Sequence, residues 1–268
     1  MKRSARVAFG GAVHHAFEHA DGVQLVDGRV LNEEQVVWLP PFEVGTVIAL
    51  GINYAAHAQE LAKELTLGSI GGLANGSKNG SRDEPLAFLK APNTLIGHRG
   101  VTRRPSGAAF MHYECELAVV IGCTAKRVAR NDAMACVAGY TVANDYAVRD
   151  YLENWYRPNL RVKNRDGCTA LGPWLVDAAD VLEPHALALR TLVNGRLVQS
   201  GNTRDLIDDI PALNEYLSGF MTLQAGDVIL TGTPEGVVNV NPGDEVVCEI
   251  DGIGRLVNTL VGDAAFGR

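Results

Sequence analysis

The stretch HYECELAVVIG, residues 112–122, decides the fold and raises the first question about function. Its apolar run is typical of a buried β-strand, yet Glu114 and Glu116 stand at its start. Carboxylates two positions apart on a strand point to the same face, roughly 6.6 Å from each other. Two such groups facing a core repel each other and lose their hydration, so they need protonation or a cation between them. A divalent metal is the simplest answer.

A third candidate ligand is Asp145, which ends the apolar segment GYTVAND, residues 139–145. An all-oxygen ligand set selects a hard cation such as Mg²⁺, Mn²⁺ or Ca²⁺ over zinc. The alternative interpretation places both glutamates on a solvated edge, with Asp145 capping a turn. His112 shares the face of the glutamates, and we favour an outer-shell or surface position for it over a ligand role.

The rest of the chain predicts a mixed, mainly β architecture. Residues 1–43 carry two hairpin-turn dipeptides, Asp21-Gly22 and Asp27-Gly28, and are predicted to form a small β appendage. Strand-like segments dominate after residue 86, with candidate helices at 131–139 and 204–221 between them, the second expected to kink or to start a new turn at Pro211. This order argues against the regular strand–helix alternation of a doubly wound sheet. We expect residues 44–268 to form the main domain.

A candidate catalytic pair lies in the segment NYAAHAQELAKEL, residues 53–65, which is predicted to be a helix. His57 and Glu60 are three positions apart, a spacing at which a carboxylate orients an imidazole and makes it a general base. The alternative is an ordinary exposed pair. Residues 66–85 are rich in Gly, Asn and Ser and are predicted to be a mobile connector, so that residues 53–85 would form a lid.

Two further segments are candidates for holding a substrate. Residues 156–167 contain Arg157, Arg161, Lys163 and Arg165, of which the last three would share one face of an extended chain. In the segment ILTGTPEGV, residues 229–237, backbone N–H groups at Gly232 and the hydroxyl of Thr233 could bind a carboxylate. A solvated basic edge and an ordinary Gly-Pro turn are the alternatives.

Composition excludes several classes of function. The net charge is −7 and no run of basic residues is present, so nucleic acid is an unlikely partner. No signal-peptide pattern or membrane-length apolar run occurs, and we expect a cytoplasmic protein without membrane contact. The five cysteines are scattered without C-x-x-C spacing, which indicates reduced, mostly buried thiols.

Six ordered motifs resemble the fumarylacetoacetate hydrolase family over residues 44–262. They are GINYAAHAQEL, LAFLKAPNTLIG, HYECELAVVIG, GYTVANDYAVRDY, RVKNRDG followed by LGPW, and MTLQAGDVILTGTPEGV. The resemblance implies a mixed β-roll or sandwich that dimerises. It also implies an Mg²⁺ or Mn²⁺ ion on Glu114, Glu116 and Asp145, with Lys163 near the metal and a His57–Glu60 dyad on the lid.

The resemblance is strongest to the branch of the family that works in aromatic (homoprotocatechuate) catabolism. It implies a metal-dependent isomerase of 2-hydroxyhepta-2,4-diene-1,7-dioate, a decarboxylase of 5-carboxymethyl-2-oxo-hex-3-ene-1,7-dioate, or both, acting on a small 2-oxo carboxylate. Arg157 and Arg161 would then hold the distal carboxylate of the substrate. The alternatives are an acylpyruvate hydrolase or oxaloacetate decarboxylase of the same family, and, from another class, a non-catalytic metal- or ligand-binding module.

Overall fold

The computed structural model describes residues 3–57, 84–151 and 159–266. Within them, most strands join one twelve-stranded sheet. Its main path is β4 (Val30–Leu31), β3 (Gly22–Leu25), β2 (Ala12–His19), β1 (Arg3–Phe9), β14 (Thr169–Asp177), β12 (Val137–Asp145), β11 (Cys115–Ile121), β17 (Val228–Leu230), β6 (Val47–Gly51) and β7 (Leu86–Lys90). β5 (Val37–Leu39) pairs with β1, and β8 (Leu95–Ile96) pairs with β14.

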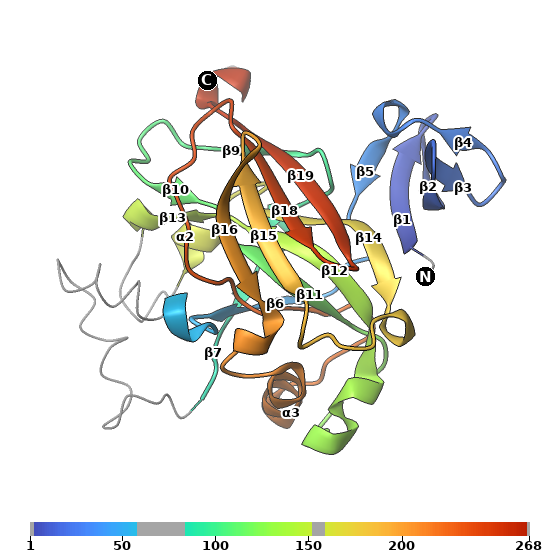
Figure 1. Ribbon diagram of the computed structural model, residues 1–268, viewed down its shortest axis with the longest axis vertical. Helices are drawn as coiled ribbons and strands as arrows, with labels where there is room; N and C mark the ends of the chain where they lie inside the picture. The colour runs from blue at the N-terminus through green and yellow to red at the C-terminus, as the bar shows by residue number, and fades with distance from the viewer. Residues whose placement is uncertain (1–2, 58–83, 152–158, 267–268) are drawn as a thin grey trace.

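A second sheet packs against the first and carries the C-terminal strands (Figure 1). Its order is β16 (Arg196–Asn202), β15 (Ala188–Val193), β18 (Glu245–Ile250), β19 (Gly254–Val261) and β9 (Val101–Arg103). A short two-stranded sheet joins β10 (Met111–His112) to β13 (Ala147–Val148). The predicted mainly β architecture is confirmed.

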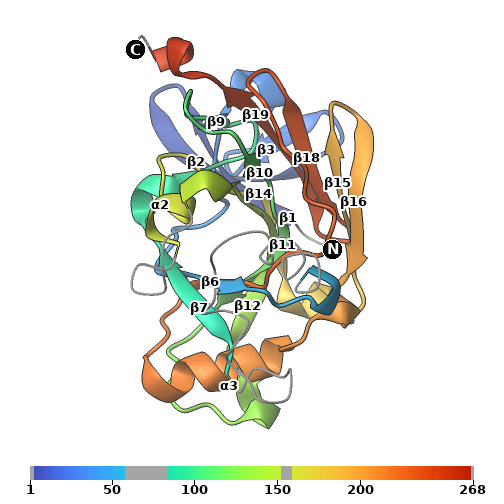
Figure 2. The ribbon, with the colours of Figure 1, turned by 90° about the vertical axis from the view of Figure 1, so that its left-hand side faces the viewer.

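Helices are few in the described ranges. α2 (Leu160–Lys163) is a single turn, and α3 (Ile210–Phe220) lies at one end of the molecule, away from α2 (Figure 2). The 3₁₀ turns are η1 (Glu33–Gln35), η2 (Pro92–Thr94), η3 (Arg130–Cys136), η4 (Arg149–Tyr151), η5 (Ala178–Asp180), η6 (Thr203–Asp205) and η7 (Asp263–Phe266).

One helix prediction is wrong, and the second segment starts a new helix next to Pro211, as its proline predicts. The segment 131–139 is not one helix, because η3 ends at Cys136 and β12 begins at the next residue. The segment 204–221 is divided into η6 and α3, and the division is set by Asp209. Its carboxylate accepts a hydrogen bond from the Ala212 N–H at 2.9 Å, which caps a new helix with Pro211 in its first turn.

Strand β11 lies at the centre of the structure with all seven residues buried. Cys115, Leu117, Val119 and Ile121 belong to the main apolar cluster, whereas Ala118 belongs to a separate cluster. The two faces of the strand therefore have different environments. Glu116 shares the face of Ala118, as the period of two predicts.

The N-terminal strands extend the large sheet. Strand β1 pairs with β14 through Arg3 with Val176 and Ser4 with Leu175, and β1–β5 stand together at one side of the molecule (Figure 1). They enclose an apolar cluster of their own that includes Trp38 and also takes in Trp174 of β14. The division of the chain into a β appendage and a catalytic domain at residue 43 stays a prediction. Among the helices that the structure describes, none is long and apolar enough to cross a membrane.

Candidate metal centre and active site

Three carboxylates converge where β11 begins and β12 ends. The two strands are antiparallel, with Cys115 opposite Asn144, so Glu114 and Glu116 at one strand start meet Asp145 at the other strand end. Each carboxylate offers an oxygen, and these oxygens all lie within 4.8 Å of one another. The structure therefore brings together the three residues that the sequence predicted as metal ligands.

Lys163 of α2 reaches the same cluster. Its Nζ lies 2.6 Å from Glu114 Oε2 and 2.9 Å from Asp145 Oδ2, and it donates to the Asp145 backbone carbonyl at 2.9 Å. Burial alone would lower the pKa of Lys163, but Asp145, Glu114 and Glu116 outweigh it and raise that pKa. Lys163 is therefore a permanent ammonium among the carboxylates. The shared face that an extended chain would give Arg161, Lys163 and Arg165 does not arise, because residues 160–163 form a helical turn.

The Glu116 carboxylate is held by the turn at Gly232. The Gly232 N–H donates to its Oε2 at 2.6 Å, whereas its Oε1 is buried without a hydrogen-bond partner. Gly232 has φ +94°, and a Cβ there would lie 3.0 Å from the Asn53 Cβ, so the turn requires glycine. Burial raises the pKa of Glu116 well above its usual value, and the neighbouring Asp145 and Glu114 carboxylates raise it further.

A divalent cation fits this arrangement. Lys163 contacts Glu114 and Asp145, but the buried Glu116 Oε1 has no hydrogen-bond partner, which is costly, and the neighbouring carboxylates repel its charge. Burial opposes ionisation of Glu114 as well, yet the Lys163 ammonium holds the pKa of Glu114 below its usual value. All the donors are oxygens, which suits a hard ion such as Mg²⁺ or Mn²⁺.

Two histidines lie near Glu114. His57 is 4% exposed, lies in a helical stretch at 55–57, and contributes to the low pKa of Glu114. His112 is buried with its Nδ1 3.7 Å from Glu114 Oε1. Its Nε2 accepts from Arg149 Nε at 2.8 Å, so its proton is on Nδ1, which faces the Tyr113 carbonyl at 3.0 Å. Burial and the Arg149 charge lower the pKa of His112. His112 is therefore a neutral imidazole next to Glu114.

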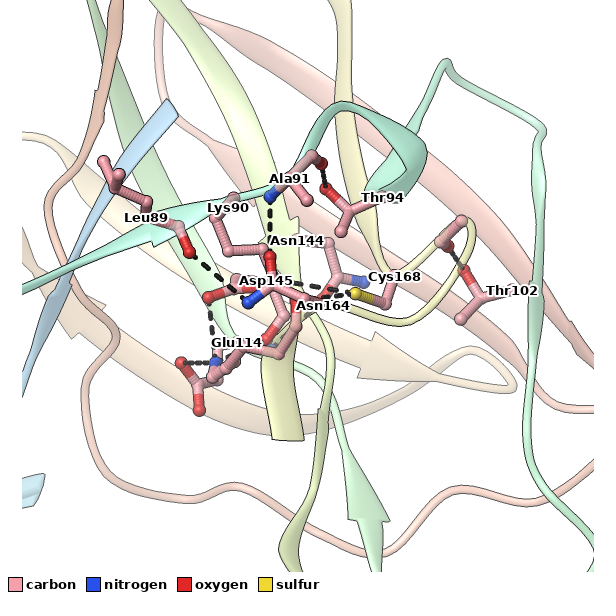
Figure 3. A network of polar contacts seen from close by, with 12 residues as sticks. Leu89, Lys90, Ala91, Thr94, Thr102, Glu114, Asn144, Asp145, Asn164 and Cys168 are labelled. Carbon is pink, nitrogen blue, oxygen red and sulfur yellow. Dashed lines mark hydrogen bonds and ion pairs between the residues drawn. The ribbon is translucent and has the colours of Figure 1, made fainter. Parts of the chain in front are cut away.

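Lys90 is a site residue that our sequence reasoning missed. Its ammonium, at the end of β7, lies 2.5 Å from Asp145 Oδ1, donates to the Lys163 carbonyl and lies 3.5 Å from Cys168 Sγ (Figure 3). The side chains of Lys90 and Asp145 are 0% and 1% exposed. The sequence signal that could have revealed it was a lysine at the end of the otherwise apolar strand LAFLK. Lys90 thus links the candidate metal ligand Asp145 to the backbone of Lys163.

Replacing Lys90 by methionine is expected to lower the free energy of unfolding of the metal-free protein by about 1.5–3 kcal/mol, because it removes one of the two buried ammonium groups that contact Asp145 and leaves only Lys163. Urea unfolding measures this difference. The matched control is Arg29→Met, which removes an ion pair to Asp27 whose side chains are both 51% exposed and is expected to leave the free energy of unfolding nearly unchanged. A Lys90→Met protein as stable as the control would contradict the assignment.

Three of the residues predicted to bind substrate, Gly232, Thr233 and Arg161, already contact other protein groups. The Gly232 N–H is engaged by Glu116, and Thr233 Oγ1 accepts from Gln199 Nε2 at 3.0 Å. The guanidinium of Arg161 lies over the Tyr151 ring, 4.6 Å from its centroid, beside a hollow of about 380 Å³. Substrate binding by these groups stays a prediction. Glu60, Arg157 and the predicted connector, apart from its last two residues, lie outside the described residues.

The comparisons with known proteins agree with the geometry. The family described as fumarylacetoacetate (FAA) hydrolase C-terminal matches residues 46–261. A 4-hydroxyphenylacetate degradation bifunctional isomerase/decarboxylase of Salmonella dublin is 53% identical over 247 residues, which are 90% of this chain and 54% of the relative. The chain thus spans about half the length of this curated relative.

Two solved structures share the fold. The 5-carboxymethyl-2-hydroxymuconate delta-isomerase of Mycobacterium smegmatis superposes with a TM-score of 0.79 at 36% identity, covering 97% of this chain and 99% of the other. The maleylpyruvate hydrolase of Sphingobium sp. SYK-6, solved with manganese(II) and pyruvate, gives a TM-score of 0.78 at 28% identity with the same coverage. These matches confirm the fold expected from the resemblance, and the chain belongs to the fumarylacetoacetate hydrolase family.

Proposed function

We propose that the chain is a divalent-metal-dependent isomerase, decarboxylase or both, acting on 2-oxo or 2-hydroxydienoic dicarboxylates in homoprotocatechuate catabolism. The observation that carries this proposal is the convergence of three carboxylates with a buried ammonium, Lys163, held against them. The identity of 53% to a bifunctional isomerase/decarboxylase supports the substrate class.

Glu114, Glu116 and Asp145 would hold Mg²⁺ or Mn²⁺, which when bound supplies Lewis-acid polarisation of a 2-oxo carboxylate. Both reactions build negative charge on the 2-oxygen of the substrate, the isomerisation through loss of a proton and the decarboxylation through loss of CO₂. The Lys163 ammonium stabilises that charge from a water-poor position, where a fixed charge acts strongly. One site therefore serves both reactions.

We assign the proton transfer to His57, oriented by Glu60. Two observations support this assignment: His57 is buried, and it is among the groups that lower the pKa of Glu114. Arg157 and Arg161 are assigned to the distal carboxylate of the substrate, since a guanidinium can bind a carboxylate in a bidentate manner. Gly232 and Thr233 are assigned to the other end of the substrate. We also propose that the working form is a homodimer.

An acylpyruvate hydrolase is the second candidate, favoured by the structural match to a maleylpyruvate hydrolase. A substrate panel separates the two candidates. With Mg²⁺ or Mn²⁺ present, kcat/KM is measured for 2-hydroxyhepta-2,4-diene-1,7-dioate, 5-carboxymethyl-2-oxo-hex-3-ene-1,7-dioate, maleylpyruvate and oxaloacetate.

We expect the first two acids to exceed oxaloacetate by about 10²-fold or more, because this four-carbon acid leaves a pocket built for a distal carboxylate unpaired. Maleylpyruvate also has a seven-carbon chain, and we expect it to react slowly because its breakdown needs hydrolysis of a carbon–carbon bond and not a proton transfer or loss of CO₂. Preference for maleylpyruvate or oxaloacetate would overturn the assignment in favour of the second candidate class. Metal binding without turnover of any acid would indicate a non-catalytic binding module.

A further inference from the structure

Two cysteines meet at the end of the β11–β12 hairpin that is farther from the carboxylates. Strand β11 ends at Ile121, opposite Val137, and the Gly122 N–H donates to the Cys136 carbonyl at 2.7 Å. Cys123 is the next residue along one side, and Cys136 is the last residue before β12 on the other. The backbone hydrogen bond thus holds the two cysteines side by side.

The two thiols are in contact. Burial raises the pKa of the Cys136 thiol, and a hydrogen bond with the Cys123 thiol raises it further. Cys123 is exposed and Cys136 is half-buried. The remaining cysteines, Cys115, Cys168 and Cys248, are all buried. Cys123 and Cys136 are therefore a thiol pair that a small reagent can reach from solvent.

The chain between the two cysteines is fixed to the body of the protein. The Ala125 N–H donates to the Leu223 carbonyl at 2.9 Å, and the Arg127 N–H donates to the Ser218 carbonyl at 2.8 Å. The Val128 N–H donates to the Ser218 hydroxyl at 3.0 Å. Because the loop is tied to α3 and to the segment that follows α3, the two cysteines are held near each other in the folded protein.

We propose that Cys123 and Cys136 form a modification site at which a two-electron oxidant of the peroxide class closes an intrachain disulfide. The Cys123 thiol, as the exposed partner, loses its proton and attacks one oxygen of hydrogen peroxide. An S–O bond forms, the O–O bond breaks, and hydroxide leaves with that proton as water.

Cys136 then acts as the resolving residue. Its sulfur attacks the Cys123 sulfur, so that the S–S bond forms, the S–O bond breaks, and a second water leaves with the Cys136 proton. Two thiols are oxidised to one disulfide, and one peroxide is reduced to two waters.

The disulfide is expected to stabilise the fold without changing the candidate active site. Cys123 is seven residues from Glu116, which is about 23 Å along a strand at 3.3 Å per residue. Closing a loop between residues 123 and 136 restricts the unfolded chain, with an expected rise in Tm of about 5 °C or more. Turnover by the metal-loaded protein should stay within about twofold, because neither cysteine is part of the proposed machinery.

The test treats the Mg²⁺-loaded protein with hydrogen peroxide and follows intact mass, peptide mass mapping and Tm. The expected result is a loss of 2 Da, a linked 123–136 peptide pair, the rise in Tm, and reversal of all three by a phosphine reductant. Cys123→Ser and Cys136→Ser, each removing one partner, should show neither the 2-Da loss nor the rise in Tm. A gain of 32 Da on Cys123 without a cross-link, a disulfide between two chains, or an unchanged mass would each overturn the proposal.

Discussion

Glu116→Gln is expected to abolish turnover and to weaken Mg²⁺ or Mn²⁺ binding by more than about 10²-fold. Loss of an outer-shell partner alone typically costs 10–100-fold in metal affinity, and Glu116 contributes a carboxylate oxygen directly. The substitution keeps the shape of the side chain and the acceptor for the Gly232 N–H, so the fold is expected to persist. Titration calorimetry with each metal, alongside kcat/KM on the substrate panel, measures both effects.

The same variant is expected to raise the Tm of the metal-free protein at neutral pH. Because the pKa of Glu116 is raised on folding, the folded protein binds its proton more tightly than the unfolded chain does. That preference stabilises the fold fully below the unfolded pKa and is lost as pH rises through the folded pKa. Glutamine removes this dependence, so the gain in Tm should shrink as pH falls towards about 4, near the ordinary value for glutamate.

An exposed glutamate serves as the control. Glu183→Gln changes the same chemical group outside the carboxylate cluster and is expected to leave metal affinity, turnover and Tm unchanged. If Glu116→Gln bound Mg²⁺ and Mn²⁺ as tightly as Glu183→Gln does, the metal assignment would be wrong.

His57→Ala is expected to lower the rate of the proton-transfer reaction by about 10² to 10⁴-fold while metal affinity stays nearly intact. The reason is that an imidazole moves a proton in the transition state but is not among the proposed ligands. Glu60→Gln should also lose activity, and the double variant should lose little more than either single variant, because two residues that act as one unit are strongly non-additive.

His15→Ala is the matched control for this series, since His15 is an exposed histidine in β2. It is expected to keep the wild-type rate. If His57→Ala and Glu60→Gln both kept the wild-type kcat on every acid tested, the pair would have no role in catalysis. The chemistry would then rest on the metal and Lys163.

The carboxylate cluster could be predicted because its signal is local. Glu114 and Glu116 stand two positions apart at a strand start, and Asp145 stands at a strand end, so strand periodicity alone places them. The likeness to a known family supplied the roles of Lys163, His57 and Glu60, which spacing alone left open. Lys90 was missed because its contact with Asp145 joins residues 55 positions apart. A terminal lysine on a strand has the same local pattern as an ordinary exposed edge residue.

The helix prediction at 131–139 failed for a related reason. Propensity over residues 131–139 is compatible with a helix, but β12 takes its last residues because Val137 and Gly139 pair with neighbouring strands. Long-range pairing in the sheet overrides local preference, and no single-segment pattern contains that information.

The spread of the site along the chain has a consequence for how the protein reaches its folded state. The Gly232–Glu116 hydrogen bond joins residues 116 positions apart, and the Lys90 contact to Lys163 joins residues 73 apart. Contacts of such sequence separation form late and slowly, since each requires a long segment of chain to be closed. Gly232 and Lys90 therefore support the carboxylate cluster only when the strands that carry them have joined the sheet. A metal ion that binds the carboxylates is a selective ligand of the native state and should slow unfolding more than it accelerates folding.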